Sequence, residues 1–159
     1  GITTGQVVDA GVRDSMNMGA AMAPAAFHTV MQNLKDLEIT KEQLEGGWYD
    51  KIITGDLGKI GKQALADLLR NEGLEAEGFL MDCGVEIYDN QKQDTHAGGS
   101  GCGCSSLVHG ALILPNIQAG IWKRVLFVPT GALLSTVSFN EGQTIPGIAH
   151  GVILERMGK

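Results

Sequence analysis

Short β-branched apolar runs alternate along the chain with longer segments in which apolar residues recur at helical spacing. Phe27, Val30 and Leu34 fall on one side of a helix predicted over residues 24–37, with Pro24 in its first turn. This alternation is typical of α/β layer proteins. It predicts strands at 5–11, 49–54, 78–82, 124–129 and 145–154, and helices at 24–37, 58–70 and from about residue 105.

These elements predict a single α/β domain, residues 1–159, in which helices pack on a mixed sheet with the chain order β-α-β-α-β-α-β-β. The last two strands are expected to pair antiparallel. A mostly parallel sheet needs helices on both faces, and only about three are available here. One helix layer should therefore contact another unit.

Local signals refine the ends of these elements. Thr40 followed by Gln43 is a capping-box pattern, and Gly73 is placed to end the helix over 58–70. Residues 85–95 are polar and predict a solvated surface loop. Pro115 is expected to end or kink the helix that begins near Ser105.

The composition narrows the class of protein. The chain carries a net charge of −6 with scattered Lys and Arg, which argues against a nucleic-acid binder. It contains neither a long apolar run nor a signal-peptide pattern, so we expect an intracellular protein without a membrane span. Three cysteines, an odd number, suit a reducing compartment. Because the chain opens with Gly1, we expect a fragment or a processed form.

The segment 97–106 concentrates glycine, serine and two cysteines just before an apolar run. Glycine lets a ligand approach the backbone closely, and a helix starting near Ser105 would add unpaired N–H groups. The pattern therefore predicts an anion-facing pocket wall with bare amides. The candidate binding residues in it are Gly98, Gly99, Ser100, Gly101, Cys102, Cys104 and Ser105.

The cysteines of this segment allow other interpretations. Cys104, near a helix start, has the placement of a reactive thiolate, although a small buried residue beside glycine is the favoured interpretation. A zinc site would use Cys102, Cys104 and His96, with Cys83 or His109 as a fourth ligand. A single C-x-C lacks the paired spacing of structural zinc sites, so we expect no metal and no cofactor.

Polar residues elsewhere also fit a pocket. Asp56 and Lys59 follow a strand end at a helix start, where α/β proteins form clefts, although a helix cap explains Asp56 equally well. Asn17 and Met18 precede a run of small residues. His150, within the last predicted strand, is expected to be a satisfied core group. The remaining candidates are Thr130 and Ser135 as hydroxyl donors, and Met16 and Met22 as pocket lining or core.

Six runs in this order resemble the stage V sporulation protein AD family, which is similar to the thiolase and ketoacyl-synthase superfamily. The runs span almost the whole chain: 17–25, 54–61, 82–84, 97–105, 130–135 and 145–150. The resemblance implies a thiolase-like fold of two similar halves with the site between them, this chain being the C-terminal half.

The resemblance also implies a function. The protein would bind dipicolinic acid, a pyridine dicarboxylate, and help its uptake into the developing spore. It would act with membrane proteins of the same operon, as a homodimer at the inner membrane of the spore or forespore. None of the four arginines falls in the shared runs, so we expect the N-terminal half to complete the pocket and this chain alone to bind weakly or not at all.

The catalytic pattern of thiolases is not matched here. Their nucleophilic cysteine belongs to the other half, and Gly98-Gly99-Ser100 stands where they have glycine-histidine-proline. Val128 or Pro129 replaces a cysteine, and Asp56 replaces an asparagine. We therefore expect a binding protein without catalysis. The alternatives are an active acyltransferase of the thiolase type and a structural subunit that docks membrane proteins.

Overall fold

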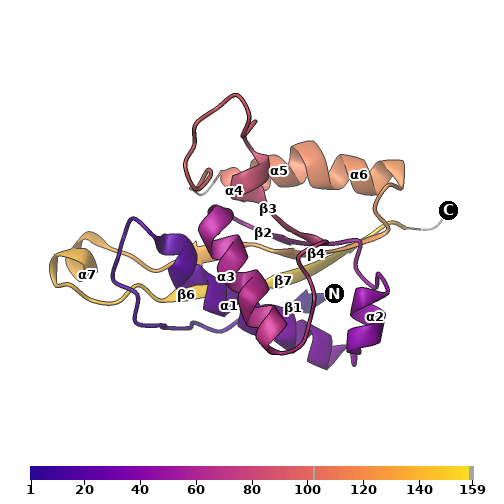
Figure 1. The fold of residues 1–159 in the computed structure, drawn as a ribbon, viewed down its shortest axis with the longest axis horizontal. Coiled ribbons are helices and arrows are strands. Elements are labelled where there is room, and N and C mark those ends of the chain that lie inside the picture. Colours follow the sequence, from indigo (N-terminus) through magenta and orange to yellow (C-terminus); the bar gives the residue numbers. More distant parts are fainter. Residues whose placement is uncertain (102, 158–159) are drawn as a thin grey trace.

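The computed structural model describes residues 1–101 and 103–157, which form a mixed sheet covered by helices on both faces (Figure 1). Strand β2 pairs in parallel with β3 and with β4. Strand β7 pairs antiparallel with β4 and with β1. The mixed α/β class and the antiparallel last pair are thus confirmed. The strand order is β1-β7-β4-β2-β3, with bounds Ile2–Thr3, Gly151–Glu155, Arg124–Val128, Lys51–Thr54 and Leu80–Asp82.

Two helix layers cover the sheet. Helices α1 (Met18–Asp36) and α3 (Gly58–Asn71) pack on one face, and a continuous helical segment packs on the other (Figure 1). Neighbouring residues of one strand alternate between the faces: Ile52 joins the core under α1 and α3, whereas Ile53 joins the core under the other layer. The second layer comprises α5 (Cys104–Val108), the π-helical turn His109–Ile113 and α6 (Leu114–Ala119).

Helix α1 begins at Met18, so the predicted start at Pro24 is wrong. The alanines before Pro24 are strong helix formers, and they extend the helix by nearly two turns. The N-terminal end of α1 lies against α3 at two glycines, where a Cβ on Gly61 would lie 2.7 Å from the carbonyl oxygen of Gly19. The close approach of the two backbones explains why a proline inside the helix is tolerated: tertiary packing outweighs local propensity.

The strand predicted over residues 5–11 is also wrong. Only Ile2 and Thr3 join the sheet, and Val8 makes a single bridge to Gly147. The chain turns at Asp9, whose Oδ1 accepts the N–H of Gly11, a residue with φ of 76°. This local turn competes with strand pairing and carries the segment away from the main sheet.

The strand predicted over 145–154 is two strands, β6 (Gly147–Ala149) and β7, that belong to different sheets. The chain changes sheet at His150, which is exposed rather than in the core; its Nδ1 accepts the N–H of Gly5. Strand β6 pairs with β5 (Thr130–Ala132), and helix α7 (Thr136–Asn140) joins them. The sequence pattern missed β5 and α7, and the predicted chain order is therefore not confirmed as it stood.

Several other predictions are confirmed. The capping box of Thr40 and Gln43 starts α2 (Lys41–Glu45), and Gly73, with φ of 78°, follows the end of α3.

Pro115 does not end its helix. It lies in the first turn of α6 directly after the π-helical turn, and Gly120 ends the helix instead. A short helix, α4 (Cys83–Glu86), precedes the predicted polar loop.

A buried chain of side-chain hydrogen bonds ties α1 to its surroundings. The Tyr49 hydroxyl donates to Asn33 Oδ1 at 2.7 Å, and Asn33 Nδ2 donates to Thr3 Oγ1 at 2.9 Å. All three side chains are buried, and burial raises the pKa of Tyr49 to about 12. The network fixes the first strand and the approach to β2 against the same helix.

Tyr49→Phe should lower the free energy of unfolding by about 1–3 kcal/mol, because it leaves the buried Asn33 Oδ1 without its donor. Urea unfolding followed by circular dichroism measures the loss. Tyr88→Phe is the matched control, since Tyr88 is 40% exposed, and should change stability by less than about 0.5 kcal/mol. Equal effects of the two substitutions would contradict the role of the network.

Candidate functional site

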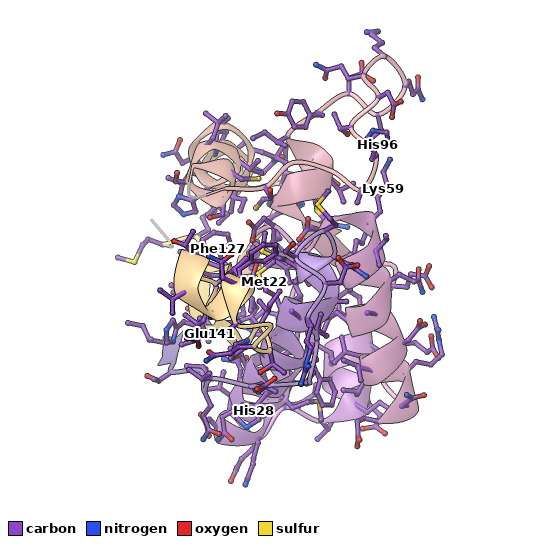
Figure 2. The ribbon with its side chains drawn as sticks, turned by 90° about the vertical axis from the view of Figure 1, so that its left-hand side faces the viewer. Met22, His28, Lys59, His96, Phe127 and Glu141 are labelled. Atoms are coloured by element: carbon purple, nitrogen blue, oxygen red, sulfur yellow. The ribbon has the colours of Figure 1, made fainter. Side chains whose placement is uncertain are left out.

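A pocket of about 570 Å³ opens where β2 and β4 end, between the N-terminal ends of α1 and α3 and the glycine-rich segment. The carboxyl ends of parallel strands meet at this edge of the sheet, which is the usual ligand position in α/β folds. Nine predicted site residues line it: Asn17, Met18, Asp56, Gly98, Gly99, Ser100, Gly101, Ser105 and Thr130. Met22 lies toward the interior, whereas Lys59 points outward from α3 (Figure 2).

The glycine-rich segment is held by its own amides. The N–H of Gly98 donates to Thr95 O, and the N–H of Gly99 donates to Gly84 O at 2.6 Å. The prediction that the amides of this loop are bare is therefore wrong at these positions, because they anchor the loop to the protein. A Cβ on Gly98 would lie 2.5 Å from Gly84 O, so glycine serves close backbone packing there.

Asp56 connects three segments that are far apart in the sequence. Its backbone N–H donates to Thr130 Oγ1 at 3.1 Å, and that hydroxyl donates to Asp56 Oδ1 at 3.0 Å. Its other carboxylate oxygen, Oδ2, accepts the N–H of Gly101 at 3.3 Å. Among the described residues that line the pocket, Asp56 alone carries a charge.

Asp82 lies beneath the pocket and is fully buried. Its Oδ2 accepts the Thr54 hydroxyl at 2.6 Å and the Leu57 N–H at 2.9 Å, and its Oδ1 accepts the Gly58 N–H at 2.9 Å. The carboxylate thus satisfies the first amides of α3 from a neighbouring strand. Burial outweighs these donors and raises the pKa of Asp82 above its ordinary value.

The thiols described in the structure are buried. Cys104 Sγ lies 3.9 Å from Gly55 O, and burial raises its pKa; burial also raises the pKa of Cys83 to about 12. Both side chains pack in the core under α5 and α6. In residues 1–101 and 103–157, no group of three or more His, Cys, Asp or Glu is placed to hold a metal. The predicted site residue Cys102 lies outside the described residues.

Two predicted residues lie away from the pocket. Lys59 lines a smaller hollow with Lys62 and Glu77, and Ser135 forms the capping box of α7 with Ser138. Beyond the nine site residues above, the sequence offered Met16 and Met22 as pocket lining or core, and both line the pocket. Ala97, at the start of the predicted wall over 97–106, also lines the pocket. Sequence reasoning did not single out the rest as pocket lining: Ser15, Gly19, Leu57, Gly58, Ile60, Gly131 and Ala132.

Comparison with known proteins identifies the family of the chain. Residues 1–155 match the family model of stage V sporulation protein AD. The chain belongs to this family. It is 44% identical over 156 residues to stage V sporulation protein AD of Bacillus subtilis (strain 168). That alignment covers 98% of the chain but only 44% of the relative, so the chain spans less than half of the relative's length.

Family membership connects the chain with a sporulation protein that is more than twice as long. Several pocket-lining residues lie in the runs that suggested the family, among them Asn17, Asp56 and Gly99.

The helices in the described part of the chain are all too short or too polar to cross a membrane.

Asp82→Asn should destabilise the protein by about 1–3 kcal/mol at neutral pH, because the new amide N–H₂ faces the N–H of either Leu57 or Gly58. The folded protein keeps its proton on Asp82 to a higher pH than the unfolded chain does. The contribution of this carboxyl to stability is therefore present at about pH 4 and declines as the pH rises through the raised pKa.

Urea unfolding of both proteins from pH 4 to pH 8 tests this sign. The stability gap between wild type and Asp82→Asn should narrow as the pH rises. A gap that widens with pH would show that the carboxylate is stabilised in its charged form instead.

In a Cys102→Ser variant, Cys83 and Cys104 should not react with a disulfide reagent at pH 7.5 until the protein unfolds, because both are buried and neutral. A spectrophotometric thiol titration with and without denaturant measures this. Rapid labelling of Cys104 in the native protein would identify an activated thiolate and favour covalent chemistry.

Proposed function

We propose that this chain forms one wall of a pocket that binds dipicolinic acid and that the protein helps its uptake into the developing spore. The observation that carries the proposal is the pocket at the sheet edge, which combines neutral hydrogen-bond donors with apolar walls in a chain of a sporulation family. A flat dicarboxylate needs both, because its ring favours apolar contact and its carboxylates need donors.

The lining residues supply these two kinds of contact from different segments. Met18, Met22 and Ile60 offer apolar surface from α1 and α3. The Asn17 amide makes no capping hydrogen bond to α1, so it is available to a carboxylate, and Ser100 and Ser105, each with a hydroxyl, line the same pocket. The volume of about 570 Å³ suits a small ligand.

The charge of the pocket indicates that other residues complete it. Asp56 would repel a dianion, and the described lining includes neither lysine nor arginine. We propose that the N-terminal half of the longer protein supplies the cations. The second helix layer supports such a neighbour, because residues 97–122 contain no charged side chain. Leu107 on α5 is 60% exposed, and Ile121, just after the end of α6, is 66% exposed.

The proposal describes a binding protein without catalysis that pairs as a homodimer and works with membrane proteins of the same operon. The buried, neutral state of Cys104 supports the non-catalytic part. A thiolase-type acyltransferase remains the alternative and would exchange acyl groups with acyl-coenzyme A in the full-length protein.

A docking role is a second candidate because the arm formed by β5, α7 and β6 (residues 130–149) exposes apolar side chains. Leu133, Val137 and Phe139 are exposed on this arm, and α7 lies at its tip (Figure 1). A structural subunit would bind its membrane partners through such a surface and would ignore dipicolinate.

Calorimetric titration of the full-length protein with dipicolinate tests the pocket. Ser105→Ala should weaken binding about three- to tenfold, the factor for one net hydrogen bond. Ser106→Ala is the matched control because Ser106 is exposed and its hydroxyl bonds Gly103 O, outside the pocket lining. The 159-residue chain alone should bind weakly or not at all. An equal loss of affinity in the Ser105→Ala and Ser106→Ala variants would show that dipicolinate does not bind in this pocket. Tight binding by the 159-residue chain alone would contradict a site shared between two halves.

A further inference from the structure

Asp56 is the place where the two sides of the pocket mouth are joined. One carboxylate oxygen accepts the Thr130 hydroxyl on β5, and the other accepts the N–H of Gly101 in the glycine-rich segment. Thr130 and Gly101 are not otherwise bonded to each other in the described residues. The carboxylate therefore bridges a strand and a loop that both line the pocket.

Two hydrogen bonds hold the loop at this position, because Gly101 O also accepts the N–H of Cys104 at 3.0 Å. Gly99 is anchored to Gly84 through its amide, but a Cβ on Gly101 would meet nothing within 4 Å. Gly101 also has φ of 107°, a conformation that only glycine adopts freely, and it is exposed. Asp56 supplies the hydrogen bond to the Gly101 N–H, and losing it leaves this position with the Cys104 bond alone.

We propose that Asp56 is a positioning residue that latches the glycine-rich loop to β5 and so fixes the width of the pocket mouth. The latch itself is a property of this chain, whereas its effect on dipicolinate rests on the proposed function. Asp56 does its work through Gly101 and Thr130 and need not touch the ligand.

The latch requires two hydrogen-bonding atoms at the end of the side chain but not its charge. An asparagine can accept the Gly101 N–H through Oδ1 and donate through Nδ2 to Thr130 Oγ1, because a hydroxyl oxygen has two acceptor sites. Alanine can do neither. Asp56→Asn should therefore preserve the latch, and Asp56→Ala should release it.

Hydrogen–deuterium exchange of the full-length protein tests the latch without any ligand. Asp56→Ala should speed exchange of the amides at 99–101 about three- to tenfold, the factor for one net hydrogen bond. Asp56→Asn should exchange like wild type. Asp36→Ala removes an exposed carboxylate that accepts only Gln32 Nε2 among the described residues, and should leave the loop unchanged. Unchanged exchange in Asp56→Ala, or equal acceleration in both Asp56 variants, would overturn the proposal.

Binding of dipicolinate to the same variants separates this proposal from the proposed function. With the latch intact, Asp56→Asn should bind at least as tightly as wild type because a like charge is removed, and Asp56→Ala should bind more weakly than Asp56→Asn. If exchange follows the prediction while wild type ignores dipicolinate, the latch stands and the proposed ligand fails. If exchange changes as expected but Asp56→Ala binds as tightly as Asp56→Asn, the loop does not control the pocket mouth.

Discussion

The buried carboxylate of Asp82 is the interaction on which the arrangement of the pocket depends. It accepts the Thr54 hydroxyl from β2 and the N–H groups of Leu57 and Gly58 at the start of α3, while its own strand pairs with β2 in register. The helix start is thereby held at the edge of the sheet, and Asp56, Leu57 and Gly58 line the pocket directly above it. A buried charge is tolerated because each oxygen has a donor, although burial still raises its pKa.

Glycine gives this region its compactness. Gly19 and Gly61 allow α1 and α3 to touch, and the backbones of Gly84 and Gly99 come into direct contact beside Asp82. In the sequence alone, glycines at this density predict backbone amides that are free to bind an anion. In the folded chain several of these amides are used internally, so the capacity for ligands moves to side chains such as Asn17 and Ser105.

The distribution of charge gives the chain two different surfaces. Charged residues are frequent before residue 97, whereas 97–122 carries none, and the helix formed there exposes Leu107 and Leu114. Together with a relative more than twice as long, this pattern favours a neighbour on that helix layer. The described lining of the pocket includes one carboxylate and neither lysine nor arginine, so the proposed dicarboxylate would need cations from such a neighbour.

Local patterns alone determined the helix over 58–70, the buried strands and the two helix ends at Thr40 and Gly73, because spacing and capping act within a few residues. They also placed most of the pocket residues, since strand ends and glycine runs are visible in one dimension. Tertiary structure decided the rest. Pro24 lies inside α1 because packing outweighs propensity, and residues 145–154 divide between two sheets because their partners, β5 and β4, come from elsewhere in the chain. The bond from Asp56 to Gly101 joins residues 45 positions apart, and only the folded backbone brings them within reach.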